Sequence, residues 1–236
     1  MPRRAIAALA ALLAVCTAAT SATKVDPIVD RVDHLMFAVA DLNAGIAQIE
    51  AMTGVKARFG GAHPGRGSRN ALLSLGPRAY LEIIAPDPEQ SSPRSLESLG
   101  LSATRQSRLI GWAFNSADLP RIVTDAGSRG LAMRQPESGE RRRPDGKVLS
   151  WRTTALVDER TGDGLVPFFI DWGATEHPSV PAPKGARLVS IRAQHPAPGS
   201  VQQIFDALGI ALKIETGSEA ALIAVLDTPR GRVELR

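Results

Sequence analysis

Three ionisable side chains stand out because of the residues around them. Glu82 interrupts the apolar segment 80–84, and Asp171 interrupts the aromatic-rich segment 168–172. A carboxylate in such a segment costs free energy unless it is paired or bound to a metal. His34 lies near the start of a third apolar segment. It is either a metal-binding or reactive residue or a partly buried histidine bonded to a backbone carbonyl. Imidazole and carboxylate groups suit metal binding and proton transfer.

A glycine-rich loop, residues 60–67, is a second candidate site. It carries His63, and Arg69 and Asn70 follow it closely. Glycines let backbone amides approach a ligand, and an arginine can pair with a carboxylate or phosphate. Asn70 is either a turn residue or an inward hydrogen-bond partner. The alternative interpretation of the whole loop is a surface hairpin.

The elements that position these residues recur in the order strand, helix, strand, strand, strand. The predicted strands are 33–39, 55–59, 71–75 and 79–85 in the first unit, 108–114, 131–135, 148–157 and 165–172 in the second, and 187–192, 211–215, 220–227 and 232–235 in the third. The predicted helices are 42–52, 118–128 and 200–208. The pattern predicts an α+β fold.

Similar residues mark the ends of the helices in these units. Asp41 and Asp118 each precede a helix, and Gly54 follows the first helix. Each unit is too small to bury its own sheet face, so we expect the units to share a cavity. A polar, proline-rich linker, 176–184, separates the second unit from the third. His177 and His195, which both precede proline, are interpreted as surface-loop residues.

Four segments together resemble the glyoxalase-like domain proteins of the vicinal oxygen chelate superfamily, which have the glyoxalase/bleomycin-resistance/dioxygenase fold. The segments are 33–35, 63–73, 80–88 and 167–172. The resemblance implies βαβββ modules whose curved mixed sheet forms a cup. Two modules would fill residues 30–175, and a third βαβββ-like unit, 185–236, would pack on the same domain.

The resemblance also implies a divalent cation (Zn, Fe, Ni or Mn) at the bottom of the cup, with His34 and Glu82 as ligands. In the second module Gly111 occupies the position of His34, and Asp171 lies near that of Glu82. Asp171 is therefore a candidate third ligand or general base. A catalytic metal needs about three protein ligands, so a weak site, a loop ligand and no metal all remain open.

The expected function is that of a metal-dependent lyase or isomerase acting on a small oxygen-bearing molecule. His63, Arg69, Asn70 and Trp172 are the predicted substrate-binding residues. The alternative is a non-catalytic protein that binds or sequesters a small molecule in the cup. Edge strands are compatible with a homodimer.

Composition excludes several other classes. The chain has 236 residues and one cysteine, which rules out a disulfide scaffold and a cysteine-rich zinc module. The basic run 141–143 lies beside acidic residues without interleaved aromatics. It is interpreted as a solvated loop, so nucleic-acid binding is not expected. The chain lacks P-loop and G-x-S-x-G sequences.

The first 22 residues resemble an export signal. Arg3 and Arg4 precede the apolar run 5–15, and small residues follow at 17–22. We expect cleavage after Ala22 or Ala19, which leaves no stable membrane span, because the apolar run is shorter than the roughly 20 residues a span needs. The protein is then periplasmic or secreted. If the leader is a start-site error, the protein is cytoplasmic.

Overall fold

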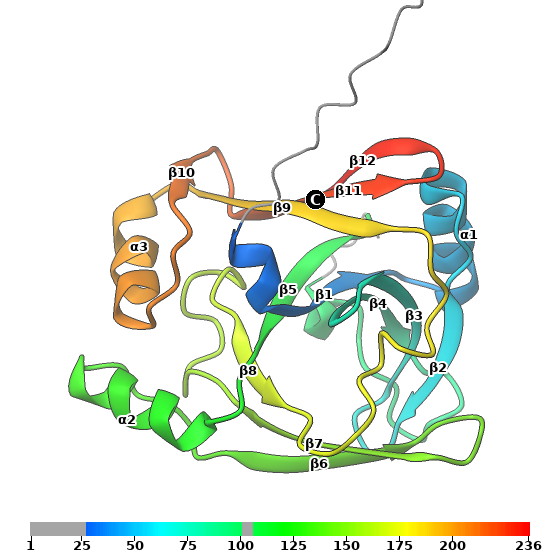
Figure 1. Ribbon diagram of the computed structural model, residues 1–236, viewed down its shortest axis with the longest axis horizontal. Coiled ribbons are helices and arrows are strands. Elements are labelled where there is room, and N and C mark those ends of the chain that lie inside the picture. The colour runs from blue at the N-terminus through cyan, green and yellow to red at the C-terminus, as the bar shows by residue number, and fades with distance from the viewer. Residues whose placement is uncertain (1–26, 101–105) are drawn as a thin grey trace, which may run out of the picture.

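The structure is a computed structural model that describes residues 27–100 and 106–236 (Figure 1). The predicted signal peptide, residues 1–22, lies outside the described residues. The predicted α+β class is confirmed, since the described residues form two β-sheets and three α-helices. None of the described helices has the length and apolar character that a membrane crossing requires.

The first unit follows the short 3-10 helix η1 (Pro27–Arg31) and contains β1 (Val32–Ala38), α1 (Leu42–Thr53), β2 (Arg58–His63), β3 (Ser68–Gly76) and β4 (Ala79–Pro86). Its helix begins and ends where the sequence predicts. The Asp41 carboxylate accepts a hydrogen bond from the Ala44 backbone N–H at 2.8 Å. Gly54 ends the helix with a φ of 77°, a left-handed conformation that favours glycine.

The second unit follows a 3-10 turn, η2 (Glu97–Leu99), and contains β5 (Arg108–Asn115), α2 (Leu119–Ser128), β6 (Glu137–Arg142), β7 (Val148–Thr154) and β8 (Phe168–Asp171). The predicted strand 131–135 is wrong, because that segment forms only an isolated bridge at Met133. The strand is instead β6, which pairs with β7 as a hairpin. Pairing with β7 supplies the backbone hydrogen bonds of this polar segment, which its composition does not reveal.

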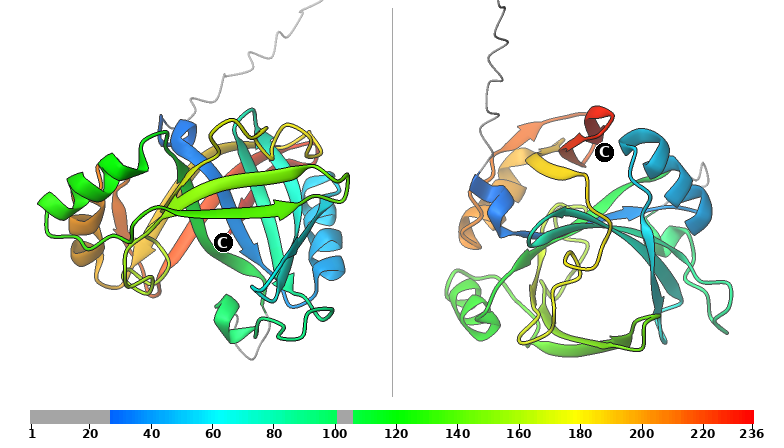
Figure 2. Two further views of the ribbon diagram at one scale, coloured as in Figure 1. Left: turned by 90° about the horizontal axis from the view of Figure 1, so that it is seen from below. Right: turned by 45° about the vertical axis from the view of Figure 1, so that its right-hand side comes forward.

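The first two units share one eight-stranded sheet with the order β2-β3-β4-β1-β5-β8-β7-β6. In both units the first strand pairs in parallel with the last, and β1 joins β5 antiparallel. The sheet curves until its edge strands, β2 and β6, contact each other. The right-hand view of Figure 2 looks into the resulting ring, which is the predicted cup in a nearly closed form.

The third unit contains β9 (Arg187–His195), α3 (Pro198–Ala207), β10 (Ile214–Thr216), β11 (Ala221–Thr228) and β12 (Gly231–Leu235). It repeats the order of elements but not the pairing, since its sheet runs β10-β9-β11-β12. Glu234 therefore lies on β12, an edge strand. There it pairs with Arg192 at 2.9 Å, on the second sheet.

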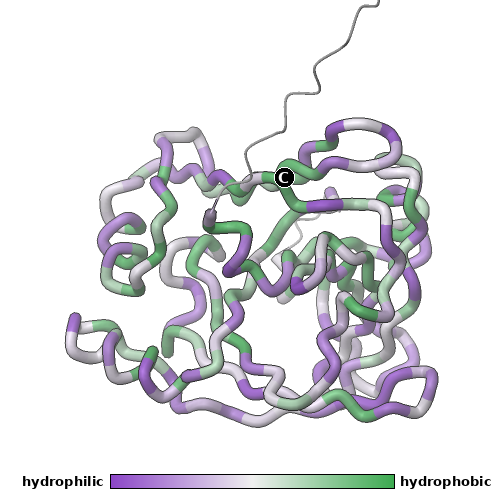
Figure 3. Tube along the Cα trace, viewed as in Figure 1, coloured by the Kyte–Doolittle hydropathy of each residue, from purple (hydrophilic) through white to green (hydrophobic). Residues whose placement is uncertain are grey.

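Hydrophobic and hydrophilic residues follow one another closely along the strands (Figure 3), and this alternation separates the two faces of the ring. One face packs with the second sheet and the helices in a single apolar core, which includes Leu35, Leu81 and Phe114. The neighbours of these residues in β1 and β4, such as His34 and Glu82, point to the other face. Polar side chains of β1 and β4 therefore point into the cup, and the apolar residues that alternate with them along the same strands form the core.

Candidate functional site

An irregularity in β1 brings two polar side chains together. Val32 pairs with Phe114 and His34 with Ala113, so Asp33 is an extra residue opposite β5. A bulge of this kind turns the strand and lets consecutive side chains approach each other. The Asp33 carboxylate contacts its neighbour, with Oδ1 2.7 Å from Nδ1 of His34. Both side chains are buried.

Asp33 binds three nitrogen atoms although it is completely buried. Besides His34, its Oδ2 accepts a hydrogen bond from the Trp172 indole at 3.0 Å and lies 3.1 Å from Nε2 of His177. Burial alone raises the pKa of this carboxyl, but hydrogen bonds with His177 and His34 outweigh burial and hold the pKa of Asp33 below its usual value. Asp33 is therefore an ionised anchor.

Asp33 determines which nitrogen of His34 faces the cup. Because the carboxylate accepts the hydrogen on Nδ1, the neutral imidazole carries its lone pair on Nε2. The ring is fixed by stacking on Tyr80, at 4.7 Å between centroids, and by the edge of Phe168 at 5.3 Å. Nε2 lies 3.8 Å from Oε2 of Glu82. An acceptor nitrogen thus faces an acceptor oxygen.

Glu82 lies between His34 and His63. Its Oε1 accepts a hydrogen bond of 2.6 Å from the Asn70 amide and lies 3.5 Å from Nε2 of His63. Burial raises the pKa of Glu82, whereas His63 and His34 in their protonated forms, the bond from Asn70 and the charge of Arg141 lower it, and the net direction is down. Glu82 is therefore ionised at neutral pH.

His63 brings a second ring nitrogen close to Glu82. Its Nδ1 lies 2.9 Å from the Ser68 hydroxyl, and its Nε2 lies 3.1 Å from the Asn70 amide nitrogen. Since an amide NH₂ only donates, Nε2 of His63 is the acceptor and Nδ1 carries the hydrogen. Burial lowers the pKa of His63, which favours this neutral form.

The residue types in this cluster suit a divalent cation, but the distances between their side chains in this structure fit a cation less well. Histidine and glutamate are common metal ligands, and a second carboxylate often holds the other ring nitrogen of such a histidine. Two tetrahedral zinc ligands stand about 3.4 Å apart, and the His34 and His63 nitrogens lie 3.8 and 3.5 Å from different oxygens of Glu82. Within residues 27–100 and 106–236, no three His, Cys, Asp or Glu side chains converge on one cation position.

Three residues singled out in the sequence lie away from this cluster. Asp171 pairs with Arg152 at 2.6 Å and accepts a bond from the Gly173 N–H, so its carboxylate is already engaged elsewhere. Arg69 lies on the opposite face of β3 from Asn70, with Nη1 4.0 Å from Glu89. Gly111 pairs with Met36 of β1 and supplies no ligating side chain. The His63 loop, in contrast, does reach Glu82.

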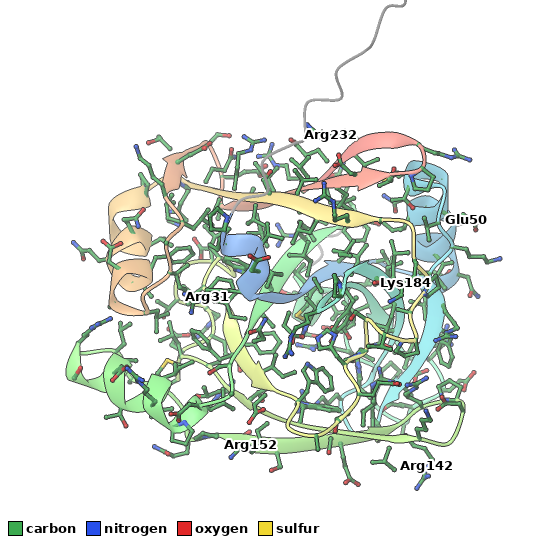
Figure 4. The ribbon with its side chains drawn as sticks, viewed as in Figure 1. Arg31, Glu50, Arg142, Arg152, Lys184 and Arg232 are labelled. Atoms are coloured by element: carbon green, nitrogen blue, oxygen red, sulfur yellow. The ribbon has the colours of Figure 1, made fainter. Side chains whose placement is uncertain are left out.

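The linker after β8 closes one side of the cup, which the sequence does not predict. His177 binds Asp33 and is not a surface-loop residue, because Ser179 and Lys184 anchor the segment around it. The Ser179 hydroxyl donates to the Pro77 carbonyl at 2.7 Å, and Lys184 Nζ donates to the Ser74 hydroxyl at 3.2 Å. Figure 4 shows Arg142 and Arg152 at the lower edge of the molecule, away from Lys184.

The interpretation of residues 141–143 as a solvated loop is wrong for Arg141. This residue lies in β6 with 7 % of its surface exposed, and its guanidinium donates to the Gly60 carbonyl across the closure of the ring. Strand alternation explains the difference, since Arg142 beside it is exposed. An arginine repeated at three consecutive positions carries no signal of which one points inward.

Comparisons with known proteins agree with this architecture. A protein-family model described as "Glyoxalase-like domain" matches residues 32–209. A solved structure of a hypothetical protein from Staphylococcus aureus has a TM-score of 0.61 at 13% identity, covering 86% of this chain and 83% of that one. This similarity shows a shared fold.

Two epimerase structures are also similar. A variant of Streptomyces coelicolor methylmalonyl-CoA epimerase, in complex with 2-nitronate-propionyl-CoA, has a TM-score of 0.45 at 23% identity and covers 63% of this chain and 98% of that one. Methylmalonyl-CoA epimerase from Mycobacterium tuberculosis has a TM-score of 0.44 at 21% identity, covering 62% and 90%. No curated protein matches this chain.

Proposed function

The chain belongs to the glyoxalase-like domain family, within the vicinal oxygen chelate superfamily, and on this premise we propose that its cup is the active site of a metal-dependent lyase or isomerase for a small oxygen-bearing molecule. One observation carries the proposal. Imidazole nitrogens of His34 and His63 lie on either side of the ionised Glu82. Among the described residues, Asn70 alone donates a hydrogen bond to this carboxylate. Acceptors that converge in this way attract a cation or the acidic hydrogen of a ligand.

His34 and Glu82 are the proposed metal ligands, and His63 is the nearest candidate for a third. A bound divalent cation would act as a Lewis acid on a carbonyl or hydroxyl oxygen of the ligand. Asp33 accepts the hydrogen on Nδ1 of His34, so the neutral ring has Nε2 available as a ligand, and Asn70 holds Glu82 in place. If His63 does not bind the cation, its neutral Nε2 would instead accept a proton from the ligand. Tyr80 and Phe168 pack against the His34 ring and exclude water from it.

Metal analysis of the purified protein tests the proposal. We expect about one zinc or manganese ion per chain after incubation and dialysis, and at least about a tenfold loss of affinity in His34→Ala. His195→Ala is the matched control: the interpretation of His195 as a surface-loop residue is wrong, because it ends β9 of the second sheet, away from the cup, and pairs there with Asp163 at 3.0 Å. Equal metal content in the wild type and His34→Ala would count against the metal site.

The second candidate is a non-catalytic protein that binds a small molecule in the same cup. The lack of three convergent metal-binding side chains among the described residues favours it. Deuterium exchange at the carbon beside a carbonyl, followed by NMR with small 2-oxo and 2-hydroxy acids, separates the candidates. Exchange that depends on Glu82 supports the enzyme. Binding of these acids without exchange supports the binder.

A further inference from the structure

A cavity lies where the ring closes, between the edge strands and the linker. Its volume is about 310 Å³, a size that admits a small organic molecule. Arg58 on β2 and Arg141 on β6 face it from the two edges of the sheet, and Arg143 lies at the hairpin beyond. Its apolar wall includes Phe59, Leu72 and Leu149.

The two facing arginines lack the partners that surface arginines usually have. Arg58 donates to the Pro181 carbonyl and Arg141 to the Gly60 carbonyl. Among the described residues, no carboxylate lies within ion-pair distance of either. Arg143 differs, since it pairs with Asp145 at 2.7 Å and Glu176 at 3.5 Å. Asp145 also lines the cavity, but it is the partner of Arg143, so Arg58 and Arg141 face the cavity with only carbonyl oxygens bound to them.

The backbone of β2 is shaped to admit the Arg141 side chain. Gly61 has a φ of 135°, and a Cβ atom built on it would stand 2.9 Å from Nη1 of Arg141. A register shift between Phe59 and Gly61 turns the Gly60 carbonyl toward this guanidinium. The position of Arg141 therefore depends on an uncommon backbone conformation that favours glycine.

Arg141 also connects the cavity with the cluster around Glu82. Burial lowers the pKa of its guanidinium, and the nearby Glu82 and Tyr80 oppose that effect. A buried cation whose nearest carboxylate lies beyond ion-pair distance is only partly compensated, and an anion bound beside it would stabilise it further. Leu72 belongs to the cavity wall and packs with Tyr80, the ring that stacks on His34.

We propose that this cavity binds the anionic end of a small organic acid, a carboxylate or phosphate held by Arg141 and Arg58, with its apolar part against Phe59 and Leu72. Guanidinium groups form paired hydrogen bonds with both anions. The inference deepens the proposed function and rests on it only in assigning the anion to the molecule that reaches Glu82. The anion-binding residues are then Arg58 and Arg141, not Arg69.

Calorimetric titration with hexanoate, hexyl phosphate and hexanol tests this proposal. We expect one of the two anions to bind the wild type with a Kd below about 10 mM, and hexanol at least about tenfold more weakly. Arg141→Gln should weaken anion binding by at least about tenfold, and Arg141→Lys by less. Arg142→Gln is the matched control, since the exposed Arg142 projects from the same strand (Figure 4).

Each contrary result overturns the proposal. The proposal is wrong if the wild type binds neither hexanoate nor hexyl phosphate. It is also wrong if hexanol binds as tightly as the anions, or if Arg141→Gln binds the anions like the wild type. If Arg141→Gln fails to fold by circular dichroism, Arg58→Gln provides the same comparison at a more exposed position. His34→Ala separates the two proposals, because it should lose metal and keep hexanoate or hexyl phosphate. Failure of metal binding alone leaves the anion site intact.

Discussion

Asp33→Asn is the substitution that most directly probes the cup. It removes one charge and replaces one acceptor oxygen by an NH₂ group with almost no change in size. The carboxylate receives three contacts, from His34 at 2.7 Å, Trp172 at 3.0 Å and His177 at 3.1 Å. An amide has one oxygen, so it cannot accept on both sides. Either the indole N–H or the imidazole N–H then faces a second donor.

The two orientations of the new amide have different consequences. If its NH₂ group faces Trp172, the indole N–H loses its acceptor, since it only donates. If the NH₂ group faces His34, the imidazole must move its hydrogen to Nε2, and the lone pair beside Glu82 is lost. Hydrogen bonds to charged groups contribute about 1.5–3 kcal/mol each. We therefore expect a loss of about 3 kcal/mol in the free energy of unfolding, weaker metal binding, or both.

Urea unfolding and zinc titration measure these effects. A loss of about 3 kcal/mol corresponds to roughly 6–12 °C in Tm for a domain of this size. Asp118→Asn is the control, because Asp118 caps α2 and asparagine caps a helix equally well. In the Asp33→Asn background, Trp172→Phe should cost less than in the wild type, since both act on one network. An Asp33→Asn protein within about 0.5 kcal/mol of the wild type and with unchanged zinc affinity would refute the reasoning.

Three further predictions concern the closure, acid stability and export. Gly61→Ala should lower the free energy of unfolding by about 2 kcal/mol in urea, because its φ of 135° is strained for alanine, whereas Gly127→Ala, with open space in α2, should not. In metal-free protein, burial lowers the pKa of His63 from 6.5, so the unfolded state binds more protons as the pH falls. Stability should decrease below pH 6.5 in urea titrations, and less so in His63→Gln; equal slopes would contradict this. N-terminal sequencing of secreted protein should begin at Thr23 or Thr20, and recovery of intact chain only from the cytoplasm would oppose export.

The local order of elements was predictable because its signals are local. Asp41 and Asp118 mark helix starts through their capping side chains, and apolar alternation marks most strands. The pairing of strands depends on contacts between distant residues, so the different sheet order of the third unit was not predictable from its repeat. β6 escaped prediction because its hydrogen bonds come from β7, while its residues are largely polar.

The candidate site was predictable only in part. Glu82 stands out because it is charged among apolar neighbours, and the structure brings His34, His63 and Asn70 to it. Asp33 was overlooked as a functional residue, although an acid directly before a strand histidine was a usable signal. His177 and Arg141 gave no such signal. The position of His177 follows from the path of the linker, which brings it to Asp33, 144 positions away. The position of Arg141 follows from the closure of the ring, which brings it to Gly60, 81 positions away.

Charge balance links the two proposals. Glu82 and Asp33 are ionised and His63 is neutral near the bottom of the cup, whereas Arg141 and Arg58 are cations where the ring closes. An organic acid entering this field has its anionic end attracted to the arginines and repelled by Glu82. Its oxygen-bearing carbon would then lie toward Glu82, where the proposed cation would offset the negative charge. On this argument, removing Arg141 should change which end of a ligand reaches His63, so a binder and an enzyme would both lose specificity for acids over alcohols.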